Sequence, residues 1–190
     1  MPHYKLTYFN LYGRAETSRI LFHLAGVPYD DVRIEMEEWA GKKSDTRWGF
    51  LPELEVDGKK LAQSYAIHLY LAKIFGFGGK DEWETARILE FLLAFDEKDE
   101  LTKSAIDGGL KPLYNRLEKS LEENGNGYFV GNQLTVADIS TFVMLTGIEE
   151  FQSGVLSEFA KLVAFVKRIE DEPKVKEWIE KRPKCPFSVM

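Results

Sequence analysis

Apolar positions in the first 75 residues recur first at a spacing of two and then at helical spacing. Tyr4, Leu6 and Tyr8 lie on one face of a predicted strand. The same patterns predict, in chain order, a strand at residues 4–9, a helix at 16–25, a strand at 29–34, an irregular helical stretch at 37–48, short strands at 54–56 and 60–62, and a helix from 64. A right-handed crossover makes the first two strands parallel. This βαβ unit followed by ββα predicts a thioredoxin-like α/β domain.

The stretch from Leu51 to Ile67 is the most informative part of this half. Asp57-Gly58 predicts a tight hairpin, because both central residues of such a turn need a positive φ. Ser64 then opens the helix. The N–H groups at a helix N-terminus lack partners, so a small carboxylate can bind there with help from the Ser64 hydroxyl. The alternative is that Ser64 only caps its own helix.

The second half of the chain has a helical pattern throughout. Residues 76–80 are rich in glycine and predict a linker between dissimilar halves. Apolar residues then keep helical spacing at 84–95, 110–121, 159–169 and 175–181, and Thr135 with Asp138 predicts a capping box at the start of another helix. The predicted domains are residues 1–79 and an all-helical bundle at 80–190.

Composition and charge narrow the class of protein. The 190 residues are 44% hydrophobic and carry a net charge of −6, which argues against a nucleic-acid or anionic-membrane partner. Cys185 is the only cysteine, so an intrachain disulfide is excluded. The N-terminus has no apolar signal region, and no apolar run is long enough for a membrane span. We therefore expect a cytoplasmic globular protein. Three scattered histidines and one cysteine predict no metal site.

Tyr8 and the residues after it are the first candidates for chemistry. A thioredoxin-type redox enzyme needs two cysteines at the start of its first helix, but this chain has Asn10-Leu11-Tyr12-Gly13 there. If the fold acts on sulfur, a ligand must bring that sulfur. By itself, Tyr8 is explained as a core tyrosine whose hydroxyl reaches the surface.

Several separated residues together resemble the glutathione-binding half of a cytosolic glutathione transferase, with a sigma-like pattern. They are Tyr8, Arg14, Trp39, Lys43, Leu51-Pro52 and Gln63-Ser64. The resemblance covers nearly the whole chain and implies the glutathione transferase fold, with a thioredoxin-like N-terminal domain and a helical-bundle C-terminal domain. It also implies a homodimer.

The resemblance implies that Tyr8 is the catalytic residue and that Arg14 supports it. A free thiol has a pKa of about 8.5, and the thiolate is the nucleophile. A hydrogen bond from the Tyr8 hydroxyl to the glutathione sulfur, worth about 1.5–3 kcal/mol, lowers that pKa by about 1–2 units.

The resemblance also assigns the other contacts of glutathione. Trp39 and Lys43 meet its glycine end, and Leu51, which a family-typical cis bond joins to Pro52, pairs with its cysteinyl part. Gln63 and Ser64 hold the γ-glutamyl end. The full expected set is Tyr8, Arg14, Trp39, Lys43, Gly49, Phe50, Leu51, Gln63, Ser64 and Asp96. His68 is given no role.

The chain departs from the family pattern at residues 81–110, where several helical turns are missing. In the family this region builds the dimer contact and one wall of the second-substrate site. A carboxylate of the partner subunit meets the glutathione amino group there, and Asp96 is the candidate, with a solvated charge run as the alternative.

The expected function is a detoxifying transferase that conjugates glutathione to hydrophobic electrophiles. Two alternatives stay open: glutathione-dependent isomerisation of a lipid such as a prostaglandin endoperoxide, and a non-enzymatic hydrophobic-ligand-binding or structural protein. The sequence does not identify the second substrate.

Overall fold

The structure is a computed structural model that describes residues 2–94 and 110–185. It divides into two compact units, one of residues Met1–Gly76 and Pro173–Met190 and the other of Phe77–Glu172. The predicted division into residues 1–79 and 80–190 stays a prediction about folding domains.

The first unit is built on a four-stranded mixed sheet with the order β2-β1-β3-β4. The strands are β1 (Tyr4–Phe9), β2 (Asp30–Ile34), β3 (Glu53–Val56) and β4 (Lys59–Ala62). β1 is parallel to β2 and antiparallel to β3, and β3 is antiparallel to β4. The predicted parallel pairing of the first two strands and the hairpin are confirmed.

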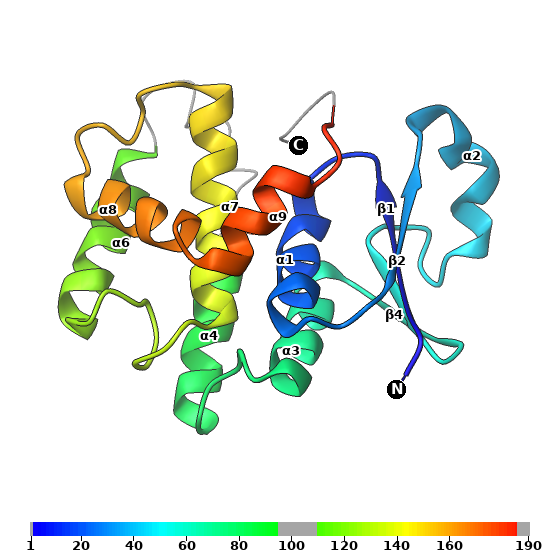
Figure 1. Cartoon of the computed structure of the whole chain (residues 1–190), viewed down its shortest axis with the longest axis horizontal. Coiled ribbons are helices and arrows are strands. Elements are labelled where there is room, and N and C mark those ends of the chain that lie inside the picture. Colours follow the sequence, from blue (N-terminus) through cyan, green and yellow to red (C-terminus); the bar gives the residue numbers. More distant parts are fainter. Residues whose placement is uncertain (1, 95–109, 186–190) are drawn as a thin grey trace. The chain divides into compact units, whose positions relative to one another are not determined.

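Helices cover both faces of this sheet (Figure 1). On one face, α1 (Glu16–Ala25) packs against α3 (Ser64–Phe75). On the other lies the irregular stretch predicted at 37–48, which forms the 3₁₀ turn η2 (Met36–Glu38), the short helix α2 (Trp39–Lys42) and the turn η3 (Lys43–Asp45). A further 3₁₀ turn, η1 (Gly13–Ala15), precedes α1.

Local chemistry explains where these elements turn and pack. Asp57 and Gly58 have φ values of 48° and 80°, as a tight hairpin requires. Leu6 of β1 and Leu54 of β3 are fully buried opposite each other. Phe22 of α1 is also fully buried, so the core lies between the sheet and the α1–α3 face.

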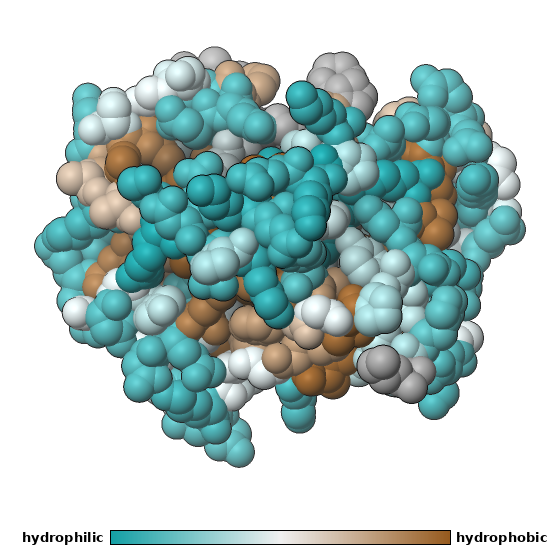
Figure 2. Space-filling view, in the orientation of Figure 1, coloured by the Kyte–Doolittle hydropathy of each residue, from teal (hydrophilic) through white to brown (hydrophobic). Residues whose placement is uncertain are grey.

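The helix α9 (Pro173–Lys181) belongs to the first unit and packs against α1. Lys174 Nζ donates to the Leu24 carbonyl at 2.6 Å, and Trp178 Nε1 donates to the Glu16 carboxylate at 2.8 Å. Arg182 Nη1 reaches the same carboxylate at 2.9 Å. The outer face of α9 is hydrophilic (Figure 2). A buried carboxylate therefore anchors the helix on α1 from one side while its other side faces water.

The second unit is helical over its described residues. Its helices are α4 (Glu82–Ala94), α6 (Lys111–Asn124), α7 (Val136–Phe151) and α8 (Ala160–Glu170). The capping box predicted at the start of α7 is confirmed: Asp138 accepts hydrogen bonds from the Thr135 N–H and hydroxyl, both at 2.8 Å. Phe129 packs against Phe91 and Phe165 in the core.

Candidate active site

The sheet topology brings the predicted site residues of the first unit to one end. Phe9 pairs with Ile34, and Thr7 pairs with Glu53, which in turn pairs with Ala62. The C-terminal ends of β1, β2 and β4 therefore meet the N-terminal end of β3. The segments that carry the predicted residues all begin or end there, although they are far apart in sequence.

Tyr8 lies near the end of β1, with only 6% of its surface exposed. Its hydroxyl oxygen accepts a hydrogen bond from the Arg14 backbone N–H at 3.3 Å. Burial raises the pKa of Tyr8, and the bond from Arg14 and the charges of Arg14 and Arg19 only partly oppose that rise. The hydroxyl keeps its proton at neutral pH, and because the Arg14 bond uses an oxygen lone pair, that proton is left to donate.

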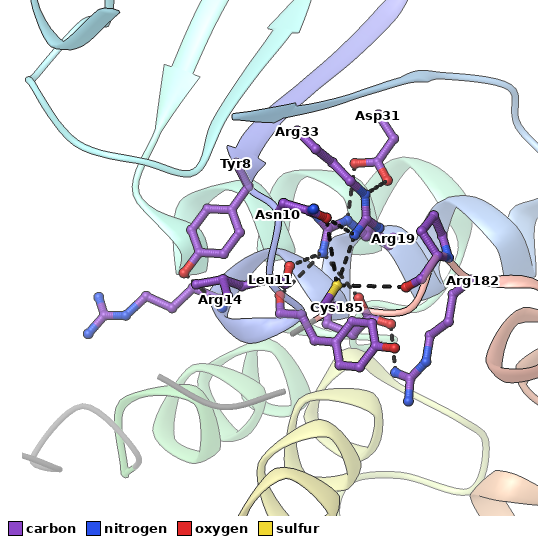
Figure 3. Close-up of polar contacts among 12 residues, drawn as sticks. Tyr8, Asn10, Leu11, Arg14, Arg19, Asp31, Arg33, Arg182 and Cys185 are labelled. Atoms are coloured by element: carbon purple, nitrogen blue, oxygen red, sulfur yellow. Dashed lines mark hydrogen bonds and ion pairs between the residues drawn. The ribbon is translucent and has the colours of Figure 1, made fainter. Parts of the chain in front are cut away.

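The segment between β1 and α1 is held in place from α1. Arg19 is fully buried, and its Nη1 donates to the carbonyls of Leu11 at 2.6 Å and Tyr12 at 3.3 Å. The carboxylates of Glu16 and Asp31 balance its charge. Figure 3 shows this arrangement, with Tyr8 and Arg14 on the same side of the segment. The Leu11-Tyr12 segment that leads into the turn containing Arg14 is thus held by charge-assisted hydrogen bonds.

Trp39 and Lys43 follow β2 on the exposed stretch of short helical turns. The Trp39 ring packs edge-on against Phe9, with centroids 5.4 Å apart, which ties it to the end of β1. Lys43 lies beside Gly49: a Cβ built on that glycine would be 3.3 Å from Lys43 Cε. Trp39 begins α2 and Lys43 follows its last residue, so the two residues belong to two consecutive short turns of the stretch predicted to be irregular and helical.

The residues before β3 form the next part of the site. Gly49 has a φ of 68°, the Phe50 side chain is 63% exposed, and the Leu51–Pro52 bond is cis, as the resemblance implies. Glu53 anchors this loop, because its carboxylate accepts the Arg47 N–H at 2.7 Å. The loop is therefore ordered from the sheet side while Phe50 stays exposed.

Gln63 and Ser64 form the start of α3. Gln63 is the N-cap, with φ 75° and ψ 116°, a conformation that costs a residue with a side chain about 1–3 kcal/mol. It makes no side-chain capping bond, and Ser64, which is 5% exposed, is the first helical residue. The first-turn N–H groups and the Ser64 hydroxyl can together hold a carboxylate. Strained backbone at such a place is typical of a binding site.

Asp96 lies outside the described residues. Tyr8, Arg14, Trp39, Lys43, Gly49, Phe50, Leu51, Gln63 and Ser64 all lie in segments that meet at one end of the sheet. No group of three His, Cys, Asp or Glu side chains suited to a metal ion occurs within the described ranges. Within those ranges, no helix has the length and apolar character to cross a membrane.

Three buried polar residues support the site and have no role in the sequence prediction. Glu16 and Arg19 hold the segment after β1, and His68 of α3 is only 3% exposed. One signal for the first two exists in the sequence: they fall on the helical stripe that also carries the buried Ile20. Cys185 Sγ accepts a hydrogen bond from Arg33 Nη1 at 3.2 Å, and we assign this cysteine no role.

Comparison with known proteins identifies the family. The glutathione S-transferase N-terminal domain matches residues 4–73, and the glutathione S-transferase C-terminal domain matches residues 85–182. Glutathione S-transferase 1 of Ascaris suum is 37% identical over 207 residues, covering 98% of this chain and all of the relative. S-crystallin SL11 of Nototodarus sloanii is 35% identical, with the same coverage. The chain belongs to the glutathione S-transferase family and is a glutathione transferase, with glutathione as its co-substrate.

Solved structures agree with this assignment and with the predicted fold class. A monomeric glutathione S-transferase of Necator americanus has a TM-score of 0.90 at 33% identity, covering 97% of this chain and all of that one. Prostaglandin synthase D of Nilaparvata lugens has a TM-score of 0.88 at 33% identity, covering 96% of this chain and all of that one. The alignment with the Ascaris relative runs over 207 positions, more than the 190 residues of this chain, so the relative has positions that this chain lacks.

Proposed function

We propose that glutathione binds along the end of the sheet in an extended form. Its γ-glutamyl carboxylate meets the Ser64 hydroxyl and the first N–H groups of α3, next to Gln63. Its cysteinyl part pairs with the backbone of Leu51 like an added strand. The support is that the first residue of α3 and the loop before β3 meet at the same end of the sheet as Tyr8.

The glycine end of glutathione then extends towards Trp39 and Lys43. A cation there suits the terminal carboxylate. The contact of Trp39 with Phe9 and of Lys43 with Gly49 supports this, because both contacts tie the exposed turns back to the site end of the sheet. Gly49 and Phe50 belong to the loop before β3 and are proposed to contact glutathione there.

Tyr8 stabilises the glutathione thiolate in this proposal. The thiol loses its proton to solvent, and the Tyr8 hydroxyl donates a hydrogen bond to the sulfur. Arg14 contributes positive charge nearby. The single observation that carries the proposal is a buried, protonated Tyr8 whose oxygen is oriented by the Arg14 N–H, since such a hydroxyl is organised to donate.

The reaction is thioether formation with a hydrophobic electrophile. The thiolate electron pair forms a carbon–sulfur bond, and a leaving group departs with its own pair, or a proton is taken up when the electrophile is an activated alkene. No oxidant or metal enters this balance. Binding of both reactants side by side supplies the rest of the rate gain.

Isomerisation of a lipid endoperoxide is the second candidate. It uses the same thiolate, and the structural likeness to prostaglandin synthase D of Nilaparvata lugens favours it. The two candidates differ in the second substrate, so the thiolate site alone does not separate them.

We also propose that the protein is a sigma-like, cytoplasmic, detoxifying transferase with domains at residues 1–79 and 80–190. It forms a homodimer in this proposal, and Asp96 of one subunit meets the amino group of the glutathione bound to the other. Because a structurally similar glutathione S-transferase is monomeric, the molar mass in solution, measured by light scattering, tests the proposed dimer.

The test of the proposed function is product analysis. The protein is incubated with glutathione and an activated aryl halide, or with glutathione and a prostaglandin endoperoxide, and products are identified by mass spectrometry. We expect thioether to form faster in the first incubation than without protein, more slowly with Tyr8→Phe, and at the wild-type rate with Tyr4→Phe, which changes a buried tyrosine of the same strand face. Isomer formation without any thioether would favour the second candidate.

A further inference from the structure

His68 makes a contact with the segment that orients Tyr8. It lies one turn after Ser64 on α3, and its ring is buried. Its Nε2 is 3.2 Å from the carbonyl oxygen of Arg14. A carbonyl only accepts hydrogen bonds, so Nε2 carries the proton and donates. His68 Nδ1 is buried and has no hydrogen-bond partner in the part of the chain that the structure describes.

Arg14 is therefore bonded through both of its backbone polar groups. Its N–H donates to the Tyr8 hydroxyl oxygen, and its carbonyl accepts from His68. Arg19 of α1 holds the carbonyls of Leu11 and Tyr12, the two residues before the turn that contains Arg14. The carbonyl of residue 14 is thus held from α3, while the residues before it are held from α1.

We propose that His68 is a positioning residue for the thiol-activating tyrosine, which it serves by holding the Arg14 peptide so that its N–H meets the Tyr8 oxygen. This inference rests on the proposed function, because it assigns His68 a part in the same thiolate site. It does not make His68 a catalytic residue: the imidazole acts only through Arg14 and Tyr8.

The electrostatics of the ring suit this role. Burial lowers the pKa of His68 to about 4, although the bond to the Arg14 carbonyl acts in the opposite direction. The ring stays neutral at physiological pH and keeps the single tautomer with hydrogen on Nε2. α3 also carries Ser64 at its start, so one helix connects the proposed carboxylate site with the orientation of Tyr8.

The test measures the pKa of the bound glutathione thiol by ultraviolet difference absorbance. His68→Leu removes the donor from a buried position, and we expect the thiol pKa to rise by about half to one unit and kcat/KM below that pKa to fall about three- to tenfold. The dissociation constant of glutathione should change less than twofold. An unchanged thiol pKa in this variant would overturn the inference and leave His68 as a core residue.

Two amide variants separate positioning from packing. His68→Gln places an N–H near the position of Nε2, and we expect it to restore the thiol pKa. His68→Asn keeps an amide but is too short to reach that position, and we expect it to behave like His68→Leu; it also serves if the leucine variant does not fold. A glutamine variant as impaired as the asparagine variant would contradict positioning through Nε2.

The combination with Tyr8→Phe distinguishes this inference from the proposed function. In that background, adding His68→Leu should not shift the thiol pKa further, because the imidazole acts through the tyrosine hydroxyl. A further shift in the double variant would overturn the inference alone. If Tyr8→Phe itself leaves the thiol pKa unchanged, the proposed role of Tyr8 in thiolate formation is wrong, whatever the result for His68→Leu.

Discussion

The backbone N–H of Arg14 donates to the hydroxyl oxygen of Tyr8 at 3.3 Å. Because this bond comes from the backbone, residue 14 has two distinct proposed roles. Its peptide N–H orients the tyrosine, and its guanidinium adds positive charge. The two roles can be tested apart, because substituting the side chain leaves the peptide N–H in place.

Arg14→Ala should therefore weaken thiolate formation without abolishing it. The peptide bond to Tyr8 remains, while the positive charge that helps to lower the pKa of the Tyr8 hydroxyl is lost. We expect the bound thiol pKa to rise by about 0.5–1 unit, less than in Tyr8→Phe. Ultraviolet titration of the two variants side by side decides this, and an Arg14→Ala shift as large as that of Tyr8→Phe would contradict the separation.

Ser64→Ala should weaken glutathione binding without changing the thiol. The hydroxyl at the start of α3 is proposed to bind a carboxylate, and such a charged bond is worth about 1.5–3 kcal/mol. We expect the dissociation constant measured by calorimetry to rise about tenfold or more, with an unchanged pKa of the bound thiol. Ser18→Ala is the matched control, since Ser18 is a buried helical serine of the same unit. Equal affinities of the two variants would show that Ser64 only belongs to its helix.

Glu16→Gln should destabilise the first unit. The Glu16 carboxylate is 1% exposed and bonds Arg19, Arg182 and Trp178, so neutralising it leaves buried guanidinium charge poorly compensated. We expect a loss of about 3 kcal/mol in the free energy of unfolding, measured by urea denaturation.

The control for this prediction is Glu177→Gln on α9. Glu177 pairs with Lys181 at 46% exposure, and exposed pairs contribute little. We expect its urea midpoint to stay close to that of the wild type. A matching loss in the two variants would mean that the Glu16 bonds have no special part in holding α9 on α1.

The pH dependence of stability should carry a contribution from His68. Its pKa is about 4 in the folded protein and about 6.5 when unfolded, so between these values the unfolded state binds more protons. The neutral ring therefore favours folding above pH 6.5, and that advantage, about 3 kcal/mol, is lost as the pH falls towards 4.

Asp138 has the opposite slope in the same interval, because burial raises its carboxyl pKa to about 6. Unfolding free energies of the wild type and of His68→Gln are therefore compared at several pH values from 4 to 7. Because only the wild type carries the His68 ring, we expect its unfolding free energy to fall more than that of the glutamine variant as the pH is lowered from 7 to 4. Parallel profiles would contradict a buried neutral His68.

Local rules predict much of the fold from the sequence. The Asp57-Gly58 hairpin and the Thr135–Asp138 box each depend on neighbouring residues, and both are present. The packing of α9 on α1 depends instead on contacts such as that between Trp178 and Glu16, 162 residues apart, which no local pattern encodes.

The site follows the same division. Local patterns predict the places of Tyr8 near the end of a strand and of Ser64 at the start of a helix, but the roles proposed for them come from the resemblance to glutathione transferases. His68 could not be found, because its role depends on a bond to a backbone carbonyl 54 residues away. Periodicity shows that a helical residue faces the core but does not show which buried polar atom it meets.

The central claim is that Tyr8 stabilises the glutathione thiolate. Its most direct test is the ultraviolet difference spectrum of the glutathione complex as a function of pH, for the wild type, Tyr8→Phe and the control Tyr4→Phe. We predict thiolate formation below about pH 7.5 in the wild type and the control, and a shift towards the free-thiol value of about 8.5 in Tyr8→Phe. If glutathione binds all three proteins with the same thiol pKa, Tyr8 is a core tyrosine and does not activate the thiol.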